Sequence, residues 1–204
     1  MTRALVVING DDVYEDLFSA GLKLAEILVS AGFAVRTAFG TGRLGEAAYL
    51  VVLCTALGYF PPDRQAALFD AVRGGTGLLA VHATNVSPGP VYRLIGSRFV
   101  SHGPAPHESR FRVETDPDHP VTRHVRPFEV THEHYQVQTA GDVRIVAWRR
   151  GPAGREPVAY VRREGLGRVC YLQLGHDMRT WDEPAVRDIV ANAARWAGLQ
   201  GTAR

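Results

Sequence analysis

The sequence predicts an α/β protein with a flavodoxin-like parallel sheet flanked by helices and a β-rich extension in its second half. Two observations predict this fold. The first hundred residues alternate short apolar runs with stretches of helical periodicity, whereas the later residues carry mainly strand-like runs. Repeated strand–helix–strand units imply a parallel sheet that is covered on both faces by helices. The chain contains no internal repeat and no linker-like tract, so we expect a single domain over residues 1–204.

The elements of the first half follow from apolar runs and the residues that end them. Residues 4–8 form a continuous apolar run before an Asn-Gly-Asp-Asp loop, which is typical of a buried parallel strand. Apolar residues recur at helical spacing over 17–31, and Gly32 ends this helix. Pro61 and Pro62 begin the next helix, which ends at Gly74. Further strands are expected at 33–39, 49–54 and 77–82.

The second half is expected to consist of short strands between two helices. A short helix is expected at 92–99 and an amphipathic helix at 184–196. Gly165-Leu166-Gly167 predicts a turn, and therefore a hairpin, between the last two strands. The strand-like runs lie at 111–115, 135–139, 143–148, 158–163 and 169–174.

Composition and charge exclude several classes of protein. Lys and Arg total 23 against 21 Asp and Glu, so no excess of positive charge is available for nucleic acid. No apolar run is long enough for a transmembrane helix, so we expect no membrane partner and a cytoplasmic location. Cys54 and Cys170 each lie in an apolar run, which favours buried thiols over a disulfide.

Candidate site residues follow the strands. Ligands of open parallel sheets bind outside the carboxyl ends of the strands. The polar residues at these ends are Asn9, Asp11 and Asp12, then His82 and Asn85, and finally His176 and Asp177. Structural alternatives remain, because His82 could be a core histidine and one of the two neighbouring aspartates could cap the following helix. Which of Asp11 and Asp12 faces the pocket is left open.

Six of the eight histidines fall within 33 residues, namely His102, His107, His119, His124, His132 and His134. A zinc site needs three or four such ligands. His132 and His134 are two residues apart, which suits one face of a strand, whereas metalloproteases place their histidines four apart on a helix. Because the spacing matches no metal motif, we expect no required cofactor, with zinc as the alternative.

Several segments together resemble the ThuA-like (trehalose-utilisation) family. They are GGTGLLAVHA at 74–83, YRLIGSRF at 92–99 followed by His102, DHPVT at 118–122, EHY at 133–135, and GLGRV with LGH between 165 and 176. Their order and spacing are similar over about residues 4–197. The resemblance implies a core of the class I glutamine amidotransferase type. In true amidotransferases a nucleophilic cysteine occupies the turn where this chain has His82, so glutamine hydrolysis is not expected.

The first loop departs from the family pattern. The family often has a histidine after its first strand, where this chain has Asp11, Asp12, Val13 and Tyr14. If that histidine helps to bind a metal in relatives, its absence argues against a metal here. The change leaves the expected pocket richer in carboxylates.

The resemblance implies work on carbohydrates, and hydrolysis of a glycosidic bond is the preferred hypothesis. This chemistry uses one carboxylic acid and one carboxylate, which we assign to Glu133 and to Asp12 or Asp11. His82 and His176 are expected to orient hydroxyls or share proton transfer. The expected substrate-binding residues are Asp11, Asn9, His102, Tyr135, Asn85 and Asp177. No role is assigned to His107, His124 or His132.

Two alternatives stay open. One is a keto-sugar isomerase or lyase that uses His82 and Glu133 as acid and base. The other is a sugar-binding domain without catalysis, because fold determines function poorly. In each case the expected partner is a small-molecule glycoside or sugar. The oligomeric state is left open between a monomer and a symmetric homodimer.

Overall fold

The computed structural model describes residues 2–198 except 12, 14, 88 and 152–153. The strands are β1 (Thr2–Gly10), β2 (Phe33–Phe39), β3 (Leu50–Ala56), β4 (Gly77–Val81), β5 (Ser97–Ser101), β6 (Glu108–Thr115), β7 (Phe128–Glu133), β8 (Gln136–Thr139), β9 (Arg144–Gly151), β10 (Gly154–Glu164) and β11 (Gly167–Leu172). The helices are α1 (Leu17–Ser30), α2 (Pro62–Arg73), the 3-10 helix η1 (His82–Val86), α3 (Val91–Ile95), α4 (Met178–Asp182) and α5 (Pro184–Gly198).

One mixed sheet runs through the molecule in the order β2-β1-β3-β4-β11-β10-β9-β6-β7. The pairs from β2 to β11 are parallel, and those from β11 to β7 are antiparallel. The predicted α/β class is therefore confirmed. The β-rich second half continues the same sheet from β11, and only β5 and β8 pair separately.

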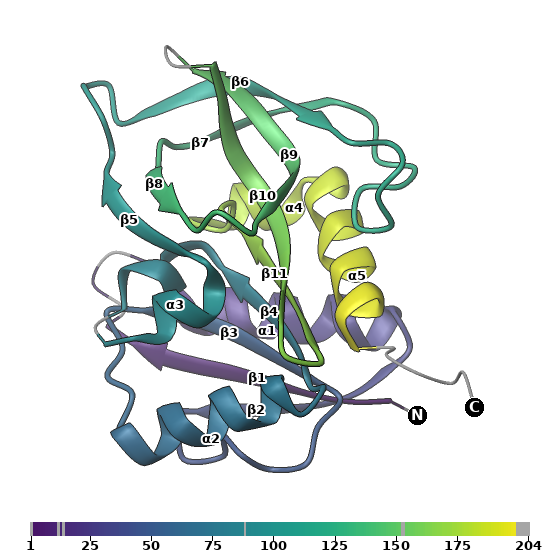
Figure 1. The fold of residues 1–204 in the computed structure, drawn as a ribbon. Coiled ribbons are helices and arrows are strands. Elements are labelled where there is room, and N and C mark those ends of the chain that lie inside the picture. Colours follow the sequence, from purple (N-terminus) through teal and green to yellow (C-terminus); the bar gives the residue numbers. More distant parts are fainter. Residues whose placement is uncertain (1, 12, 14, 88, 152–153, 199–204) are drawn as a thin grey trace.

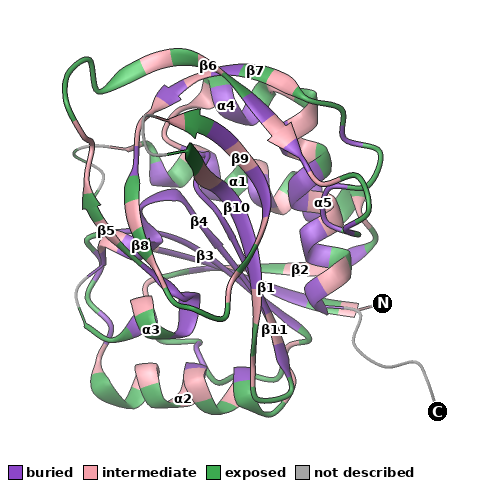
Figure 2. Cartoon of the chain, turned by 45° about the horizontal axis from the view of Figure 1, so that its top comes forward, coloured by how far each residue is buried: buried purple, intermediate pink, exposed green. Residues whose placement is uncertain are grey.

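Helices cover the two faces of the parallel half (Figure 1). Side chains alternate along β1, so that Val6 packs with α1 and α5 whereas Val7 packs in the cluster that contains α2 and α3. Figure 2 shows the buried residues concentrated in the central strands between these layers. Cys54 and Cys170 are buried free thiols, as expected. Among the described helices, none is both long and apolar enough to cross a bilayer.

The antiparallel strands rise above the carboxyl edge of the parallel half in Figure 1. The register of β10 against β9 shifts between Pro157 and Ala159 and again before Tyr160. Such irregularities bend a strand and increase its twist. This bend agrees with the position of the end of β7, which lies close to the end of β4 although the two strands are far apart in the sheet order.

The structure differs from the predicted elements at three places. The helix expected at 92–99 ends at Ile95, because Gly96 adopts a left-handed conformation with φ +89°, and β5 follows. The strand expected at 77–82 ends at Val81, since His82 begins η1. Strand β7 and helix α4 were not predicted.

Candidate functional site

A cavity of about 460 Å³ lies at the carboxyl edge of the parallel strands. Its polar wall is formed by Glu15, His102, Glu133, Tyr135 and His176. Its apolar wall is formed by Val13, Ala56, Leu57, Ala83, Val86 and Phe99. Concave sites that combine an apolar surface with a few convergent polar groups are the usual place for small-molecule binding.

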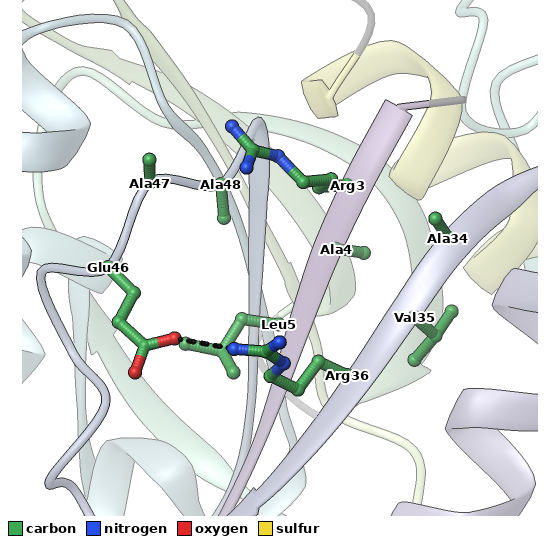
Figure 3. A pocket seen from close by; sticks show the side chains of 9 residues that line it. All are labelled: Arg3, Ala4, Leu5, Ala34, Val35, Arg36, Glu46, Ala47 and Ala48. Carbon is green, nitrogen blue, oxygen red and sulfur yellow. Dashed lines mark hydrogen bonds and ion pairs between the residues drawn. The ribbon is translucent and has the colours of Figure 1, made fainter.

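A second cavity, of about 320 Å³, lies against the amino-terminal halves of β1 and β2 (Figure 3). The Arg36 guanidinium and the Glu46 carboxylate form an ion pair of 3.2 Å beside it. Its other lining residues are Arg3 and small or apolar side chains. It therefore offers a charged surface, but none of the acid–base side chains gathered at the carboxyl edge.

His82 occupies the sharp turn between β4 and η1. Its φ is +42°, an unfavourable value for a residue with a side chain, and the residue is 1% exposed. The ring Nδ1 lies 2.7 Å from the Gln173 carbonyl, and the Tyr171 hydroxyl donates to the His82 carbonyl at 2.8 Å. Because Nδ1 donates to this carbonyl, the other ring nitrogen, Nε2, is the one that faces Tyr135, Glu15 and Glu133.

Three oxygens surround His82 Nε2. They belong to the Tyr135 hydroxyl at 3.2 Å, the Glu15 carboxylate at 3.3 Å and the Glu133 carboxylate at 3.5 Å. Burial acts to lower the pKa of His82, but Glu133, Glu15 and the Gln173 carbonyl outweigh burial and raise it. The surroundings of His82 therefore favour its protonated form.

Glu133 lies between two imidazoles at the end of β7. One carboxylate oxygen is 3.5 Å from His82 Nε2 and 3.3 Å from His176 Nδ1. Burial acts to raise the pKa of Glu133, but His82 and His176 outweigh burial and lower it. Both Glu133 and His176 are partly exposed to the cavity, so a ligand in the cavity can reach them.

His132 is buried behind this site and fixes two of its members. Its Nε2 accepts the backbone N–H groups of Gly175 and His176 at 3.0 and 3.1 Å. Its Nδ1 therefore carries the proton and donates to the Glu133 carbonyl at 2.9 Å. Burial, reinforced by His82, lowers the pKa of His132 to about 3, which agrees with this neutral form. The sequence analysis gave His132 no role. Its contacts are with the backbone of Glu133, Gly175 and His176.

The structure brings five of the predicted site residues together at the cavity. Glu133, Tyr135, His176 and His102 line it, and the buried His82 lies beneath it, with Nε2 in contact with Glu15 and Glu133. The Tyr135 ring stacks on that of His82 with centroids 4.6 Å apart. His102 Nδ1 is 3.1 Å from the His134 carbonyl.

Of the two aspartates proposed as the second carboxylate, Asp11 is not among the residues that line the cavity. Asp11 is exposed and accepts the Val13 N–H at 2.9 Å, which is a local turn contact. Asp12 lies outside the described residues.

Three further predicted binding residues make structural contacts instead. The Asn9 amide donates to the Tyr59 carbonyl at 3.1 Å. Asn85 is buried and donates to the Ser97 hydroxyl at 3.3 Å. Asp177 caps helix α4 by accepting a backbone N–H of that helix. Polar residues at strand ends thus also form hydrogen bonds that stabilise neighbouring segments of the chain.

Glu15 is the residue that the sequence reasoning missed. It directly precedes Asp16, which caps α1 by accepting the Ser19 N–H at 2.8 Å. The cap fixes the chain direction at this point, and the Glu15 side chain, 9% exposed, is directed at His82. The available signal was a carboxylate next to a helix cap in the loop after the first strand.

Fold and site together define an α/β protein with a histidine–carboxylate cavity at the carboxyl edge of its sheet. Residues 4–197 match the ThuA family, described as trehalose utilisation, and the chain belongs to that family. Comparison with curated protein sequences gives no match.

Solved structures of ThuA-like proteins share the fold. A ThuA-like protein from Parabacteroides merdae has a TM-score of 0.79 at 18% identity, covering 100% of this chain and 92% of its own. One from Bacteroides uniformis has a TM-score of 0.74 at 18% identity, covering 96% and 90%. A β-galactosidase from Bacillus circulans has a TM-score of 0.70 at 11% identity, covering 96% of this chain but 31% of its own. At these identities the likeness concerns the fold alone.

Proposed function

We propose that this protein hydrolyses the glycosidic bond of a sugar or a glycosylated small molecule, with Glu133 as the residue that transfers the proton. One observation carries the proposal. A cavity-facing Glu133 carboxylate lies between two imidazoles, and a second carboxylate, Glu15, contacts the same His82 nitrogen. Membership of a trehalose-utilisation family supports a sugar as the substrate.

The spacing of the two carboxylates supports this chemistry. Glu15 and Glu133 each place an oxygen on His82 Nε2, at 3.3 and 3.5 Å, so the two oxygens are at most about 6.8 Å apart. Carboxyl pairs of glycosidases are about 5–5.5 Å apart in retaining enzymes and about 6.5–9.5 Å apart in inverting ones. Among the described residues, Glu15 therefore has the position that was expected for Asp11.

The thiols do not support a cysteine route. Cys54 is buried in β3 with its sulfur 3.9 Å from the Leu17 carbonyl. Burial raises the pKa of the Cys170 thiol to about 12. Neither residue is among those described as lining the cavity. Acid–base chemistry by carboxylates and imidazoles is thus the chemistry that the cavity wall favours.

The cavity walls also indicate how a sugar would be held. Carboxylates and imidazoles suit hydroxyl groups, and Phe99 is an aromatic residue of the wall against which the apolar side of a sugar ring would pack. Two further neighbours of the same fold are cytoplasmic proteins from Salmonella typhimurium, with 11% and 12% identity, and we propose the same location here.

The test is Glu133→Gln, assayed on a panel of disaccharides and aryl glycosides that includes trehalose. We expect the wild type to release free sugar and the variant to lose a factor of about 10²–10⁴ in turnover, the usual contribution of a general acid–base group. Glu129→Gln is the matched control, because Glu129 lies on the same strand but is exposed and pairs with Arg110. The control should keep wild-type turnover.

Each other outcome overturns the proposal. A Glu133→Gln variant with near wild-type turnover removes the role of Glu133. A product of unchanged mass establishes isomerisation instead, which the contact between His82 and Glu133 would also serve. Saturable binding without turnover of any member of the panel establishes a sugar-binding domain.

A further inference from the structure

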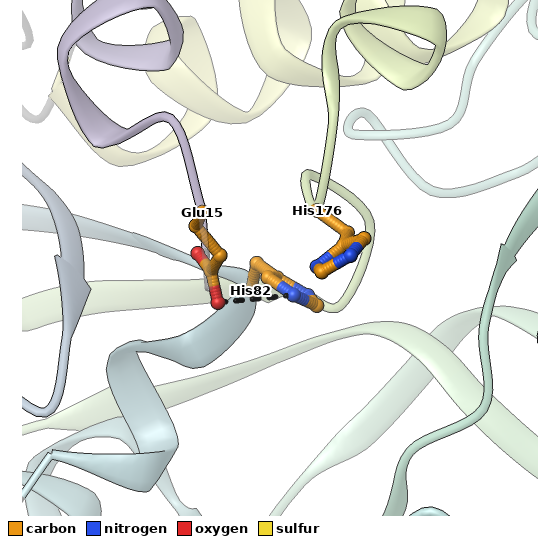
Figure 4. A group of neighbouring side chains, drawn as sticks. All are labelled: Glu15, His82 and His176. Carbon is orange, nitrogen blue, oxygen red and sulfur yellow. Dashed lines mark ion pairs between the residues drawn. The ribbon is translucent and has the colours of Figure 1, made fainter. Parts of the chain in front are cut away.

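Glu15, His82 and His176 converge on one point at the floor of the cavity. Each offers one ligand atom, and these atoms all lie within 4.8 Å of one another. Figure 4 shows the carboxylate and the two imidazole rings approaching the same space from three separate segments of the chain. We propose that these three residues bind a divalent transition-metal ion of the zinc type.

The donor set is the first argument. Two imidazole nitrogens and one carboxylate are the protein ligands of several catalytic zinc sites, which keep a further position open. Imidazole also suits the other divalent ions of the first transition row. Glu15 and His82 are buried and His176 is half-buried, so the ligands are held by packing while one side faces the cavity.

The distances are the second argument. An ion pair with a direct hydrogen bond has its nitrogen and oxygen about 2.7–2.9 Å apart. The distance from His82 Nε2 to the Glu15 carboxylate is 3.3 Å. Ligand bonds of about 2.0–2.1 Å in a tetrahedron place ligand atoms about 3.3–3.4 Å apart. The His82–Glu15 distance is therefore long for a direct ion pair and matches two atoms that share an ion, and the His176 ligand atom lies within 4.8 Å of both.

The surroundings of His82 are the third argument. Metal-binding histidines usually donate their other ring N–H to a carbonyl or carboxylate, which fixes the ring and its tautomer. His82 Nδ1 makes this contact with the Gln173 carbonyl at 2.7 Å. His82 Nε2 then faces the Glu15 and Glu133 carboxylates at 3.3 and 3.5 Å and the Tyr135 hydroxyl at 3.2 Å. A cation bound at Nε2 would take the place of the proton that these carboxylates otherwise favour there.

His176 adds a fourth argument. Its Nδ1 is buried and makes no hydrogen bond within the described part of the chain, although the Glu133 carboxylate is 3.3 Å away. A buried polar atom without a partner is costly, and a bound cation is one way to satisfy it. Two carboxylates so close together in a partly buried site also favour a cation of charge two.

This site changes the expectation drawn from the first loop. That loop lacks the family histidine, but Glu15 supplies a carboxylate from the same loop. With an ion bound, Glu15 acts as a ligand and Glu133 stays beside it as the proton carrier. A zinc ion would supply an activated water at neutral pH. The inference rests on the contacts described above and holds whether or not the reaction is glycoside hydrolysis.

The experiment is metal binding by the chelator-treated full chain. Zinc is added and the bound metal is measured by elemental analysis after desalting, and affinity is measured by calorimetry. The cobalt-loaded protein gives a visible absorption spectrum that reports on the ligands. We expect one ion per chain for the wild type. Glu15→Gln and His176→Gln should each weaken binding at least tenfold and alter the cobalt spectrum.

His102→Gln is the matched control, because His102 lines the same cavity but is outside the proposed ligand set, and it should bind zinc like the wild type. Circular dichroism checks that every variant is folded. Failure of the wild type to bind an equivalent of zinc or cobalt would overturn the inference, as would equal binding by the wild type and His176→Gln. Zinc binding without glycoside turnover would uphold the metal site and reject the proposed hydrolysis, and glycoside turnover by a protein that binds neither zinc nor cobalt would do the reverse.

Discussion

Replacement of His132 by phenylalanine tests whether this buried histidine stabilises the two segments that bring Glu133 and His176 to the cavity. Phenylalanine keeps most of the ring volume but can neither accept nor donate a hydrogen bond. The variant therefore leaves the N–H groups of Gly175 and His176 and the Glu133 carbonyl without their present partner. These groups belong to the two segments that carry His176 and Glu133 into the cavity.

The magnitude follows from these bonds. An unsatisfied buried donor or acceptor costs about 1–3 kcal/mol. Gly175 is buried, whereas His176 and Glu133 are intermediate and reach water at lower cost. We therefore expect the free energy of unfolding to fall by about 2–4 kcal/mol. With a urea m-value of about 1–3 kcal/mol/M, the midpoint should fall by about 0.7–4 M.

Urea unfolding followed by circular dichroism measures this change, and His119→Phe is the control. His119 is buried and accepts one N–H, that of Val121 at 3.2 Å, far from the cavity. The control should lose less stability than His132→Phe and should keep wild-type zinc affinity. The His132→Phe variant should have both a lower free energy of unfolding and a weaker affinity for zinc. A loss below about 1 kcal/mol in His132→Phe would refute the reasoning, because one unsatisfied buried group alone costs that much.

Two further predictions concern other parts of the structure. Gly175→Ala should destabilise the fold by about 2–6 kcal/mol, because the new Cβ would lie 2.7 Å from the buried Trp181 ring, 3.3 Å from His82 Cβ and at φ +142°. Gly32→Ala, at φ +95° with nothing within 4 Å, isolates the backbone strain, and equal losses in thermal unfolding would exclude the clash. Burial, aided by Arg144, lowers the pKa of His119, so the unfolded chain binds the extra proton below pH 6.5. The stability advantage of the wild type over His119→Phe should therefore shrink between pH 7.5 and 5.5, and an unchanged or wider gap in urea unfolding would contradict this sign.

Much of the parallel half could be predicted from the sequence, because its strands are continuous apolar runs between clear helix signals. Strand β7 could not, since only alternate residues are buried and the run is short and polar. His132 lies on the buried side of β7 together with Val130. His134 lies beyond the end of the strand and contacts the Ser109 hydroxyl at a partly buried position. A sequence pattern does not indicate which face is inward until the pairing partner is known.

The rule that ligands bind at the carboxyl ends of parallel strands predicted the place of the cavity. His176 follows a buried strand and lines the cavity, and His82 follows another and contacts Glu133 and Tyr135 of the cavity wall. Asn85 and Asp177 follow the same strands, but Asn85 donates to the Ser97 hydroxyl of β5 and Asp177 caps helix α4. This difference depends on the direction of each side chain. Glu15 was missed because it belongs to neither the strand nor the helix, and its orientation depends on the cap that follows.

The position of Glu133 at the outermost strand of the sheet has a practical consequence. Glu15 lies in the first connection of the chain and Glu133 at the end of β7, so any ligand that contacts both joins the parallel and antiparallel halves. Such a ligand binds only the completely folded chain and raises the unfolding free energy, by about 2.7 kcal/mol at a hundred times its Kd. Melting-temperature shifts across a library of sugars and metal ions would therefore reveal natural ligands of this protein before any turnover is known.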